Sequence, residues 1–301
     1  TFGGASVAVV NAGTININFN RIISNTAAVA AGKNISTGGG SVGSMNTNNN
    51  WWGVNFGPSV SDILGIPASN WLQLKTTASP ATICTTPTGP GNTSTVTASF
   101  QSNSVNAAIA PADLSVLVGL PVNWTATLGT LGAPQELTIQ ADGEAINTFT
   151  SNGTGGTATV IAQVDNVPAT DGLAVANIAV NTSSTAPTGA TGTTSVCSGG
   201  STTLTVDGGS KGTGAITEWF TASCGGTSAG TGDAITVSPI VTTTYYVRYS
   251  GVCNTTTCAT VTVTINTNST APTGATGTTT ICNGGSTTLT VNGGLKGTAA
   301  I

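Results

Sequence analysis

The chain has 301 residues, only 5% of them are charged, and the formal net charge is −4 at pH 7. Ordinary soluble proteins contain about 25% charged residues, and binding to nucleic acid requires a basic patch, which the six scattered lysines and arginines of this chain do not form. No apolar run approaches the roughly 20 residues of a membrane-spanning helix, so the sequence excludes nucleic-acid-binding proteins and a membrane span in this segment.

The composition favours strands that are joined by tight turns. The chain contains 41 glycines, about twice their usual share, and Val, Ile and Thr recur in alternating runs. β-Branched residues at alternate positions are typical of strands with one buried face. We therefore predict an all-β fold, formed by the C-terminal turns of a parallel β-helix followed by tandem immunoglobulin-like β-sandwiches.

Residues 1–67 contain short apolar groups that are separated by asparagine. Apolar residues alternate with polar ones over 13–27, and the segment SVGSMNTNNNWWG at 41–53 follows about one coil later. Asparagine side chains stack between the turns of a parallel β-helix, so we predict the end of such a helix over 1–67. Trp51 and Trp52 are predicted to cap it, because an uncapped end would expose its core and its unpaired strand edges.

Residues 68–92 are predicted to be a linker, and residues 93–180 a β-sandwich without cysteine. Apolar side chains alternate with polar ones over 122–128 (VNWTATL) and again over 158–164 (ATVIAQV). Such runs, separated by turn signals at intervals of about 10 residues, are typical of immunoglobulin-like sandwiches. The segment NTSSTAP at 181–187 is the short polar linker to the next module.

The strongest internal signal is a repeat. The segment TAPTGATGTTSVCSGGSTTLTVDGGSKGTGAI at 185–216 recurs at 270–301 as TAPTGATGTTTICNGGSTTLTVNGGLKGTAAI, with an offset of 85 residues and 26 of 32 positions identical. A unit of this length suits an immunoglobulin-like sandwich of about seven strands, which we predict over 185–266. Residues 270–301 are then the first strands of the next copy, and we expect this chain to be an internal piece of a longer protein.

The incomplete copy at 270–301 needs a partner. A piece of two strands is not stable alone in water, so either the continuation of the chain completes its sheet or a neighbouring copy donates strands, as in donor-strand polymers. The residues predicted to lie at this assembly junction are Thr270, Ile281, Leu289 and Val291.

Six cysteines, with no histidine and no CxxC pair, indicate disulfides in an oxidising compartment rather than a zinc site. Cys253 and Cys258 flank a four-residue tip of a predicted hairpin, so we expect a bond across that tip. Cys197 and Cys224 fall at the opposite end of the predicted sandwich and are expected to pair with each other. No partner within residues 1–301 is predicted for the remaining two cysteines, Cys84 and Cys282.

Three parts of the sequence resemble known families. NNNWWGVNFGP at 48–58 resembles the closing segment of right-handed β-helix regions in large bacterial surface proteins. LPVNWTATLGTL at 120–131 and GEAINTFTSNGTGGTATVIAQVD at 143–165 resemble bacterial Ig-like modules of the invasin and intimin type. The 85-residue unit, with ITEWF, TTTYYVRY and CNTTTCATVTVT, resembles the Ig-like repeats of giant secreted adhesins of gliding and related Bacteroidota. These resemblances imply adhesion, surface coating or filament formation, without catalytic residues.

The sequence offers little for catalysis or metal binding. Without histidine, a Ser-His-Asp or Cys-His site is excluded, and the pair Asp142 and Glu144 fits a turn before a strand better than acid/base chemistry. Calcium is the one cofactor that the sequence suggests, because Asp165, Asn166 and Asp171 offer hard oxygen ligands near the end of a module. The alternative is that these residues simply form turns. Further calcium candidates are Asp207 and Asp233.

We therefore expect a secreted, cell-surface-associated, non-catalytic protein that forms a repeat-built stalk, surface layer or filament. Its expected partners are copies of itself or further repeats of the same chain. The alternative is an adhesin that binds glycans or a host surface through its Ig loops or through the upstream β-helix. A third interpretation, the accessory stalk of an enzyme, would require a catalytic domain outside this segment.

Overall fold

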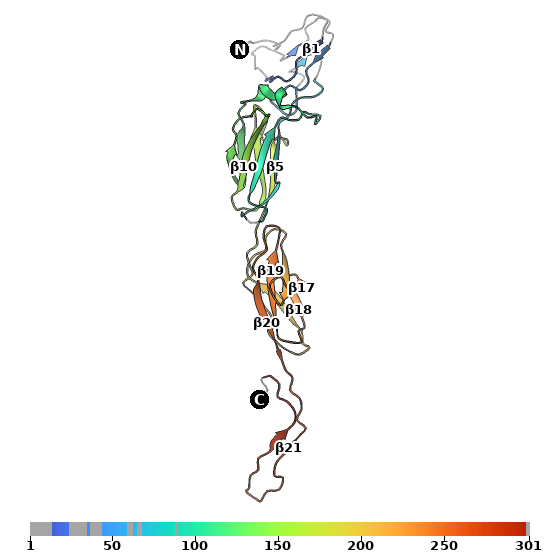
Figure 1. Ribbon diagram of the computed structural model, residues 1–301, viewed down its shortest axis with the longest axis vertical. Helices are drawn as coiled ribbons and strands as arrows, with labels where there is room; N and C mark the ends of the chain where they lie inside the picture. The colour runs from blue at the N-terminus through green and yellow to red at the C-terminus, as the bar shows by residue number, and fades with distance from the viewer. Residues whose placement is uncertain are drawn as a thin grey trace. The chain divides into compact units, whose positions relative to one another are not determined.

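The computed structural model describes residues 14–23, 35–36, 44–58, 63–64, 68–87 and 89–298. The chain divides into two compact units, Thr1–Thr182 and Ser183–Ile301. Across the described ranges the regular structure consists of short strands and one 3-10 helix, η1 at Pro111–Leu117 (Figure 1), so the prediction of an all-β fold is confirmed. None of the helical structure in these ranges is long and apolar enough to span a membrane.

The first strands that the structure describes pair in parallel, at a spacing in sequence of about one β-helix coil. The two pairs are β1 (Thr14–Asn16) with β3 (Ser44–Asn46), and β2 (Ile35–Ser36) with β4 (Ile63–Leu64). The backbone N–H of Asn20 donates to Oδ1 of Asn50 at 2.8 Å, as expected for asparagines in successive coils. Most residues between these strands lie outside the described ranges, so the β-helix over 1–67 stays a prediction.

The first unit contains a sandwich of two four-stranded sheets, in which β5 and β10 are labelled in Figure 1. One sheet has the order β5 (Lys75–Ser79), β7 (Thr93–Ser99), β10 (Glu144–Ser151) and β9 (Gly129–Gln135). The other has the order β6 (Thr82–Cys84), β12 (Val175–Asn181), β11 (Gly156–Gln163) and β8 (Asn123–Ala126). Neighbouring strands are antiparallel except for β6 and β12, which run parallel.

The predicted linker over 68–92 is wrong, because this stretch contains β5 and β6. β5 pairs with β7 in one sheet and β6 pairs with β12 in the other. The chain therefore crosses between the sheets near Pro80, a residue that has no N–H group to offer to a strand ladder. Ile83 and Cys84 of β6 have no exposed surface. The Pro, Gly and Thr content of this stretch is typical of a linker. For this reason the two short strands were not predicted from the sequence.

Alternating side chains supply the core of this sandwich. Phe149 and Ile178 have no exposed surface, and burial of a side chain of this size contributes about 1.5–3 kcal/mol. η1 adds Leu114 and Leu117, which are also fully buried. The alternation predicted over 158–164 is confirmed, because four residues of this run are at most 1% exposed: Ala158, Val160, Ala162 and Val164.

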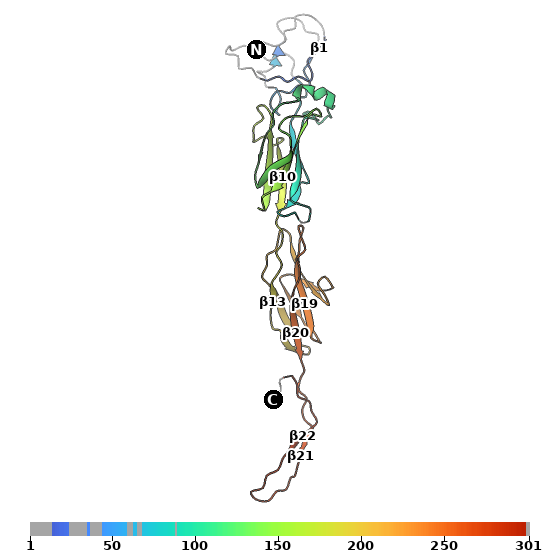
Figure 2. The same ribbon diagram turned by 60° about the vertical axis from the view of Figure 1, so that its left-hand side comes forward.

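The second unit contains a sandwich with a three-stranded and a five-stranded sheet (Figures 1 and 2). The smaller sheet has the order β13 (Gly189–Thr191), β15 (Thr202–Asp207) and β18 (Ala234–Val237). The larger sheet has the order β14 (Ser195–Cys197), β20 (Ala259–Asn266), β19 (Thr243–Ser250), β16 (Ile216–Thr221) and β17 (Thr227–Thr231). Leu204 and Trp219 lie in the core between these two sheets. Val261 and Val263 of β20 belong to the same core, and the intervening Thr262 is exposed.

The start of the next repeat forms a separate pair of strands, β21 (Gly274–Thr276) and β22 (Thr290–Asn292), both labelled in Figure 2. Leu289 and Val291 are 63% and 67% exposed. Leu204, which precedes Leu289 by the repeat offset, is fully buried in the complete copy. The described residues of this copy therefore repeat the local pairing of the complete module without covering its apolar side chains.

Candidate functional sites

Trp51 connects the segment before the first sandwich to the core of that sandwich. Its side chain has no exposed surface, and its ring meets that of Phe100 edge-on, with 4.8 Å between the ring centroids. Leu72 and Leu74 belong to the same apolar cluster. Trp52 is 5% exposed. The structure thus gives Trp51 a place in the sandwich core, and its predicted role in capping a β-helix, with that of Trp52, stays a prediction.

Asp165 also links the segment before the first sandwich to that sandwich, through polar contacts with Arg21 and Trp51. Its carboxylate accepts hydrogen bonds from Nε and Nη2 of Arg21, at 3.0 and 2.5 Å, and from Nε1 of Trp51 at 2.6 Å. The hydrogen bond to Asp165 raises the pKa of Arg21, an effect that partial burial opposes. Because the side chain of Asp165 is only 9% exposed, this bidentate contact replaces much of the water that the carboxylate would otherwise bind.

The predicted calcium residues have other partners within the protein. Beside the Arg21 contact of Asp165, the backbone N–H of Asn166 donates to the carbonyl of Gly53 at 3.0 Å. Oδ1 of Asp171 accepts from Nδ2 of Asn55 at 3.1 Å and from the backbone N–H of Leu173 at 2.9 Å. Among the residues that the structure describes, no group of three or more acidic or cysteine side chains is placed to hold a metal ion.

Calcium at Asp165, Asn166 and Asp171 therefore stays a prediction, and a melting temperature that is unchanged by EDTA would remove it. The pair Asp142 and Glu144 behaves as a turn, since Oδ1 of Asp142 accepts the backbone N–H of Glu144 at 3.0 Å directly before β10.

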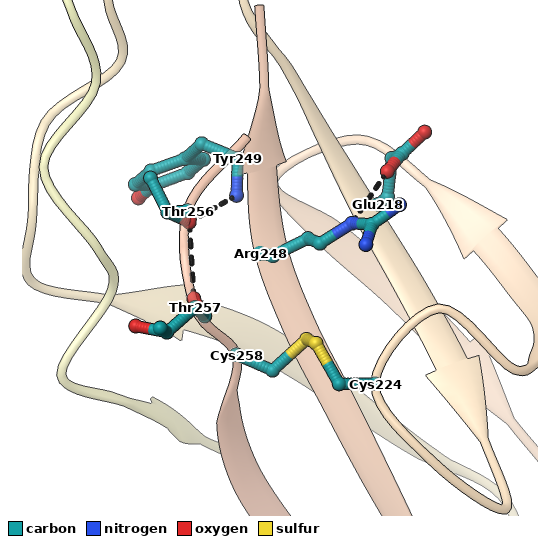
Figure 3. The surroundings of a disulfide bond; sticks show 7 residues. All are labelled: Glu218, Cys224, Arg248, Tyr249, Thr256, Thr257 and Cys258. Atoms are coloured by element: carbon teal, nitrogen blue, oxygen red, sulfur yellow. Dashed lines mark hydrogen bonds and ion pairs between the residues drawn. A yellow bond between two sulfur atoms is a disulfide. The ribbon is translucent and has the colours of Figure 1, made fainter. Parts of the chain in front are cut away.

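A disulfide between Cys224 and Cys258 braces the larger sheet of the second sandwich (Figure 3). Cys224 lies in the turn between β16 and β17, and Cys258 directly precedes β20. Their Cα atoms are 5.8 Å apart. Because β19 lies between β16 and β20 in the sheet, the bond ties two strands that are not hydrogen-bonded neighbours.

Both predicted pairings, Cys253 with Cys258 and Cys197 with Cys224, are wrong. The turn that carries Cys224 lies beside the start of β20, where Cys258 bonds to it. Cys197 instead pairs in the sheet with Asn266 at the end of that strand, about 23 Å from its start at 3.3 Å per residue. Cys253 is buried in the tip between β19 and β20 and is disulfide-bonded, as is Cys84, for which no partner was predicted.

Arg248 forms a polar cluster beside this disulfide. Nε of Arg248 donates to Oε2 of Glu218 at 2.9 Å, and its guanidinium lies 4.8 Å from the ring centroid of Phe220. Glu218 and Arg248 face each other on neighbouring strands. This cluster was not predicted, although the motifs ITEWF and TTTYYVRY each carry one charge, of opposite sign, in a chain so poor in charged residues.

A hollow at the loop end of the second sandwich carries an exposed ion pair. Nζ of Lys211 donates to both carboxylate oxygens of Asp233, at 2.6 and 2.8 Å, and Oγ1 of Thr217 donates to Oδ1 at 2.5 Å. The pKa of Asp233 is lowered mainly by the hydrogen bond from Lys211 and, to a smaller extent, by the hydrogen bond from Thr217. Ala215 and Ile216 complete one wall of the hollow, and Ile216 is 52% exposed. Sequence reasoning proposed Asp233 only as a calcium ligand.

The predicted assembly residues lie on or beside the exposed hairpin of β21 and β22. Thr270 forms an isolated bridge with Leu295, and Ile281 is 50% exposed, together with the more exposed Leu289 and Val291. Cys282, next to Ile281, is an exposed free thiol, as is Cys197. The apolar members of this set are exposed in the structure, and their role in assembly stays a prediction.

Comparison with known proteins identifies part of this chain. Residues 185–266 match the family described as Ig-like domain CHU_C associated, in agreement with the second sandwich. No curated protein matches the chain.

Solved structures that match this chain include two bacterial surface-binding proteins and a fragment of titin. The adhesin InvE of Yersinia pseudotuberculosis is 19% identical, with a TM-score of 0.30 over 68% of this chain and 66% of InvE. Invasin, a bacterial integrin-binding protein, is 16% identical, with a TM-score of 0.39 over 67% of this chain and 41% of invasin. An I-band fragment of titin is 11% identical, with a TM-score of 0.40 over 68% of each chain. This chain therefore spans less than two thirds of both bacterial proteins, and none of the three scores supports an argument about function.

Proposed function

We propose that this chain is part of a non-catalytic, extracellular adhesin in which disulfide-braced Ig-like modules carry the ligand-binding surface. The observation that supports this proposal is the hollow around Lys211 and Asp233. In a chain with 5% charged residues, it presents an ion pair whose side chains are 38% and 58% exposed, next to the exposed apolar Ile216. Disulfide bonds agree with the extracellular location.

A carbohydrate is the ligand that fits this hollow best. The Lys211 ammonium can donate to sugar hydroxyls and the Asp233 carboxylate can accept from them, while Ala215 and Ile216 offer apolar contact for the C–H face of a ring.

Binding of the whole chain to a glycan array, and to cells that carry the glycans found, tests the proposal. We expect Asp233→Asn to weaken glycan binding at least about tenfold, because a charged hydrogen bond contributes roughly 1.5–3 kcal/mol. Asp207→Asn, which changes an exposed carboxylate outside the hollow, should leave binding unchanged. Absence of glycan and cell binding by the wild-type chain, or equal binding by Asp233→Asn, would contradict the adhesin proposal.

The second candidate is a structural role in a stalk, surface layer or filament of tandem modules. It is favoured by the internal repeat, in which residues 185–216 recur at 270–301, because modules repeated at a fixed offset form arrays. On this proposal the parallel strand pairs β1–β3 and β2–β4 belong to a β-helix that precedes the Ig-like modules. A chain that binds no ligand but assembles into regular fibres would favour this candidate over the adhesin.

A further inference from the structure

Cys84 and Cys197 occupy the same place in two different modules. Cys84 is the last residue of β6 and pairs in parallel with Asn181, the last residue of β12. Cys197 is the last residue of β14 and pairs in parallel with Asn266, the last residue of β20. In both modules, a short edge strand therefore ends in a cysteine beside an asparagine where the final strand of the module ends.

The sequence around these cysteines recurs a third time. The three segments are Thr82–Cys84 (TIC), Ser195–Cys197 (SVC) and residues 280–282 (TIC). The apolar middle residue points to the core in the two complete modules, since Ile83 is fully buried and Val196 packs against the core of its sandwich. The cysteine that follows it is therefore carried to the same position by the same local structure.

The chemical states of these cysteines differ. Cys84 is disulfide-bonded and has no exposed surface, whereas Cys197 and Cys282 are exposed free thiols. A lone exposed thiol says little, but here the equivalent residue of another module in the same chain already forms a disulfide. This comparison shows that the end of the edge strand is a position from which a disulfide can form.

The other cysteines of the repeat indicate which position can bond to Cys197. Cys224 and Cys258 bond to each other, which leaves Cys197 and the tip cysteine, Cys253, as the two other cysteines of the complete repeat. Cys253 is 2% exposed and is itself disulfide-bonded. Both the edge-strand position and the tip position thus form disulfides in this chain.

These two positions lie where the chain leaves and enters a module. Cys197 lies beside Asn266, after which the chain leaves the module. The residue after Cys253, Asn254, exchanges two hydrogen bonds with the backbone of Ser184, where the chain enters the module. By the repeat offset, Ser269 is the entry residue of the next copy. It follows Asn266 by three positions, which limits the distance between their Cα atoms to about 11 Å.

We propose that the cysteine at the end of this edge strand is a disulfide site in each module, and that Cys197 bonds to the tip cysteine of the following repeat, the counterpart of Cys253. Cys282 would form the same bond one repeat later. Each junction between successive repeats is then closed by one covalent bond in addition to the peptide chain. This inference does not depend on the proposed adhesin function.

Formation of the bond requires an external disulfide, such as that of an oxidised thiol–disulfide exchange protein. The thiolate of Cys197 attacks one sulfur of that disulfide, forms a mixed disulfide and releases the other sulfur as a thiolate. The thiolate of the tip cysteine then attacks the sulfur of Cys197 and releases the second sulfur of the oxidant. Two protein thiols lose two protons and two electrons, and the oxidant is reduced to two thiols.

Disulfide mapping of the full-length native protein tests the proposal. Free thiols are blocked with iodoacetamide, the protein is digested without reduction, and linked peptides are identified by mass spectrometry. We expect most of the peptide with Cys197 to be linked to a tip peptide from the following repeat. Recovery of this peptide mainly with alkylated Cys197, or linked to a different protein, would overturn the proposal.

Two variants of the full-length protein separate this bond from general effects on folding. Cys197→Ser replaces an exposed side chain, so the module should fold, and we expect the linked peptide to disappear while one tip cysteine becomes alkylated. Cys224→Ser is the matched control, which should release Cys258 but keep the link of Cys197. No newly alkylated tip cysteine in Cys197→Ser would show that the tip has another partner and would also overturn the proposal.

Discussion

At the scale of single residues, threonine takes the part that charged residues have on most protein surfaces. Threonine hydroxyls on neighbouring strands lie within hydrogen-bond distance, at 2.9–3.2 Å, in the pairs Thr127–Thr159, Thr203–Thr236 and Thr244–Thr262. Cross-strand pairs of this kind stabilise a sheet by about 0.2–1 kcal/mol each. Three of the few charged groups, Arg21, Lys211 and Arg248, instead form ion pairs at defined places.

The first prediction concerns Asp165. Asp165→Asn leaves the guanidinium of Arg21 without its anion, and we expect the free energy of unfolding of the first unit to fall by about 1–3 kcal/mol. Urea denaturation, followed by tryptophan fluorescence, measures this change. Asp142→Asn is the control, because its turn hydrogen bond to Glu144 can be made by an amide oxygen as well. An equal, small effect of both substitutions would show that the Arg21 contact does not stabilise the junction.

The second prediction concerns the pH dependence of Asp233. Its pKa is lowered from the ordinary value of 3.8, so its ion pair stabilises the fold above that pH, and the stabilisation is lost as the pH falls through the lower folded value. With a 58% exposed side chain the effect on stability is small, but the titration itself is measurable by NMR. Lys211→Ala should move the midpoint of Asp233 up toward 3.8, whereas Lys75→Ala should not. An unchanged midpoint in Lys211→Ala would contradict the assigned cause.

At the scale of strands, alternation predicted the long elements and missed the short ones. The run TVTVTI became β20 with Val261 and Val263 buried, because a period of two decides which face is apolar. β6 and β14 have only three residues each, too few to show a period, and β6 lies in a stretch with the composition of a linker.

The disulfides show a second limit of the sequence. The sequence predicted the hairpin tip between Cys253 and Cys258. It did not predict the conformation of the turn after β16. That turn places Cys224 beside Cys258. Connectivity among several cysteines depends on such long-range geometry, which spacing alone does not give.

The third prediction concerns the disulfide between Cys224 and Cys258. Cys224→Ser opens a loop between residues separated by 34 positions, and the chain-entropy relation gives a loss of about 3–4 kcal/mol in stability. Urea denaturation of the whole chain, followed by circular dichroism, should show a lower midpoint for the second unit. In the 301-residue segment, which lacks the tip of the following repeat, Cys197 is an exposed free thiol, so Cys197→Ser should leave the midpoint unchanged. A shift of similar size in both variants would mean that the disulfide is not the source of the loss.

At the scale of the whole molecule, the repeat relates the complete and the incomplete module. Thr270 bridges Leu295 as Thr185 bridges Ser210 in the complete copy, so the local pairing needs only the first two strands. Leu204 becomes buried through strands that follow it in its own module, including β16 and β19, which carry Trp219 and Val247. The sequence could reveal the repeat by its offset, but it could not show which chain covers Leu289.

The fourth prediction concerns the part of a protein chain that packs against Leu289. If a neighbouring copy supplies it, the purified chain should associate with rising concentration into regular fibres that are visible by negative-stain electron microscopy, with a matching rise of mass in sedimentation. Leu289→Asn places an amide on the exposed apolar face of the hairpin and should abolish the fibres. Leu137→Asn changes a side chain of similar exposure, 59%, in the first unit and should leave them intact. A monodisperse wild-type chain at all concentrations would instead mean that the hairpin is covered by later strands of the same repeat, because the exposed Leu289 then has no partner among copies of this segment.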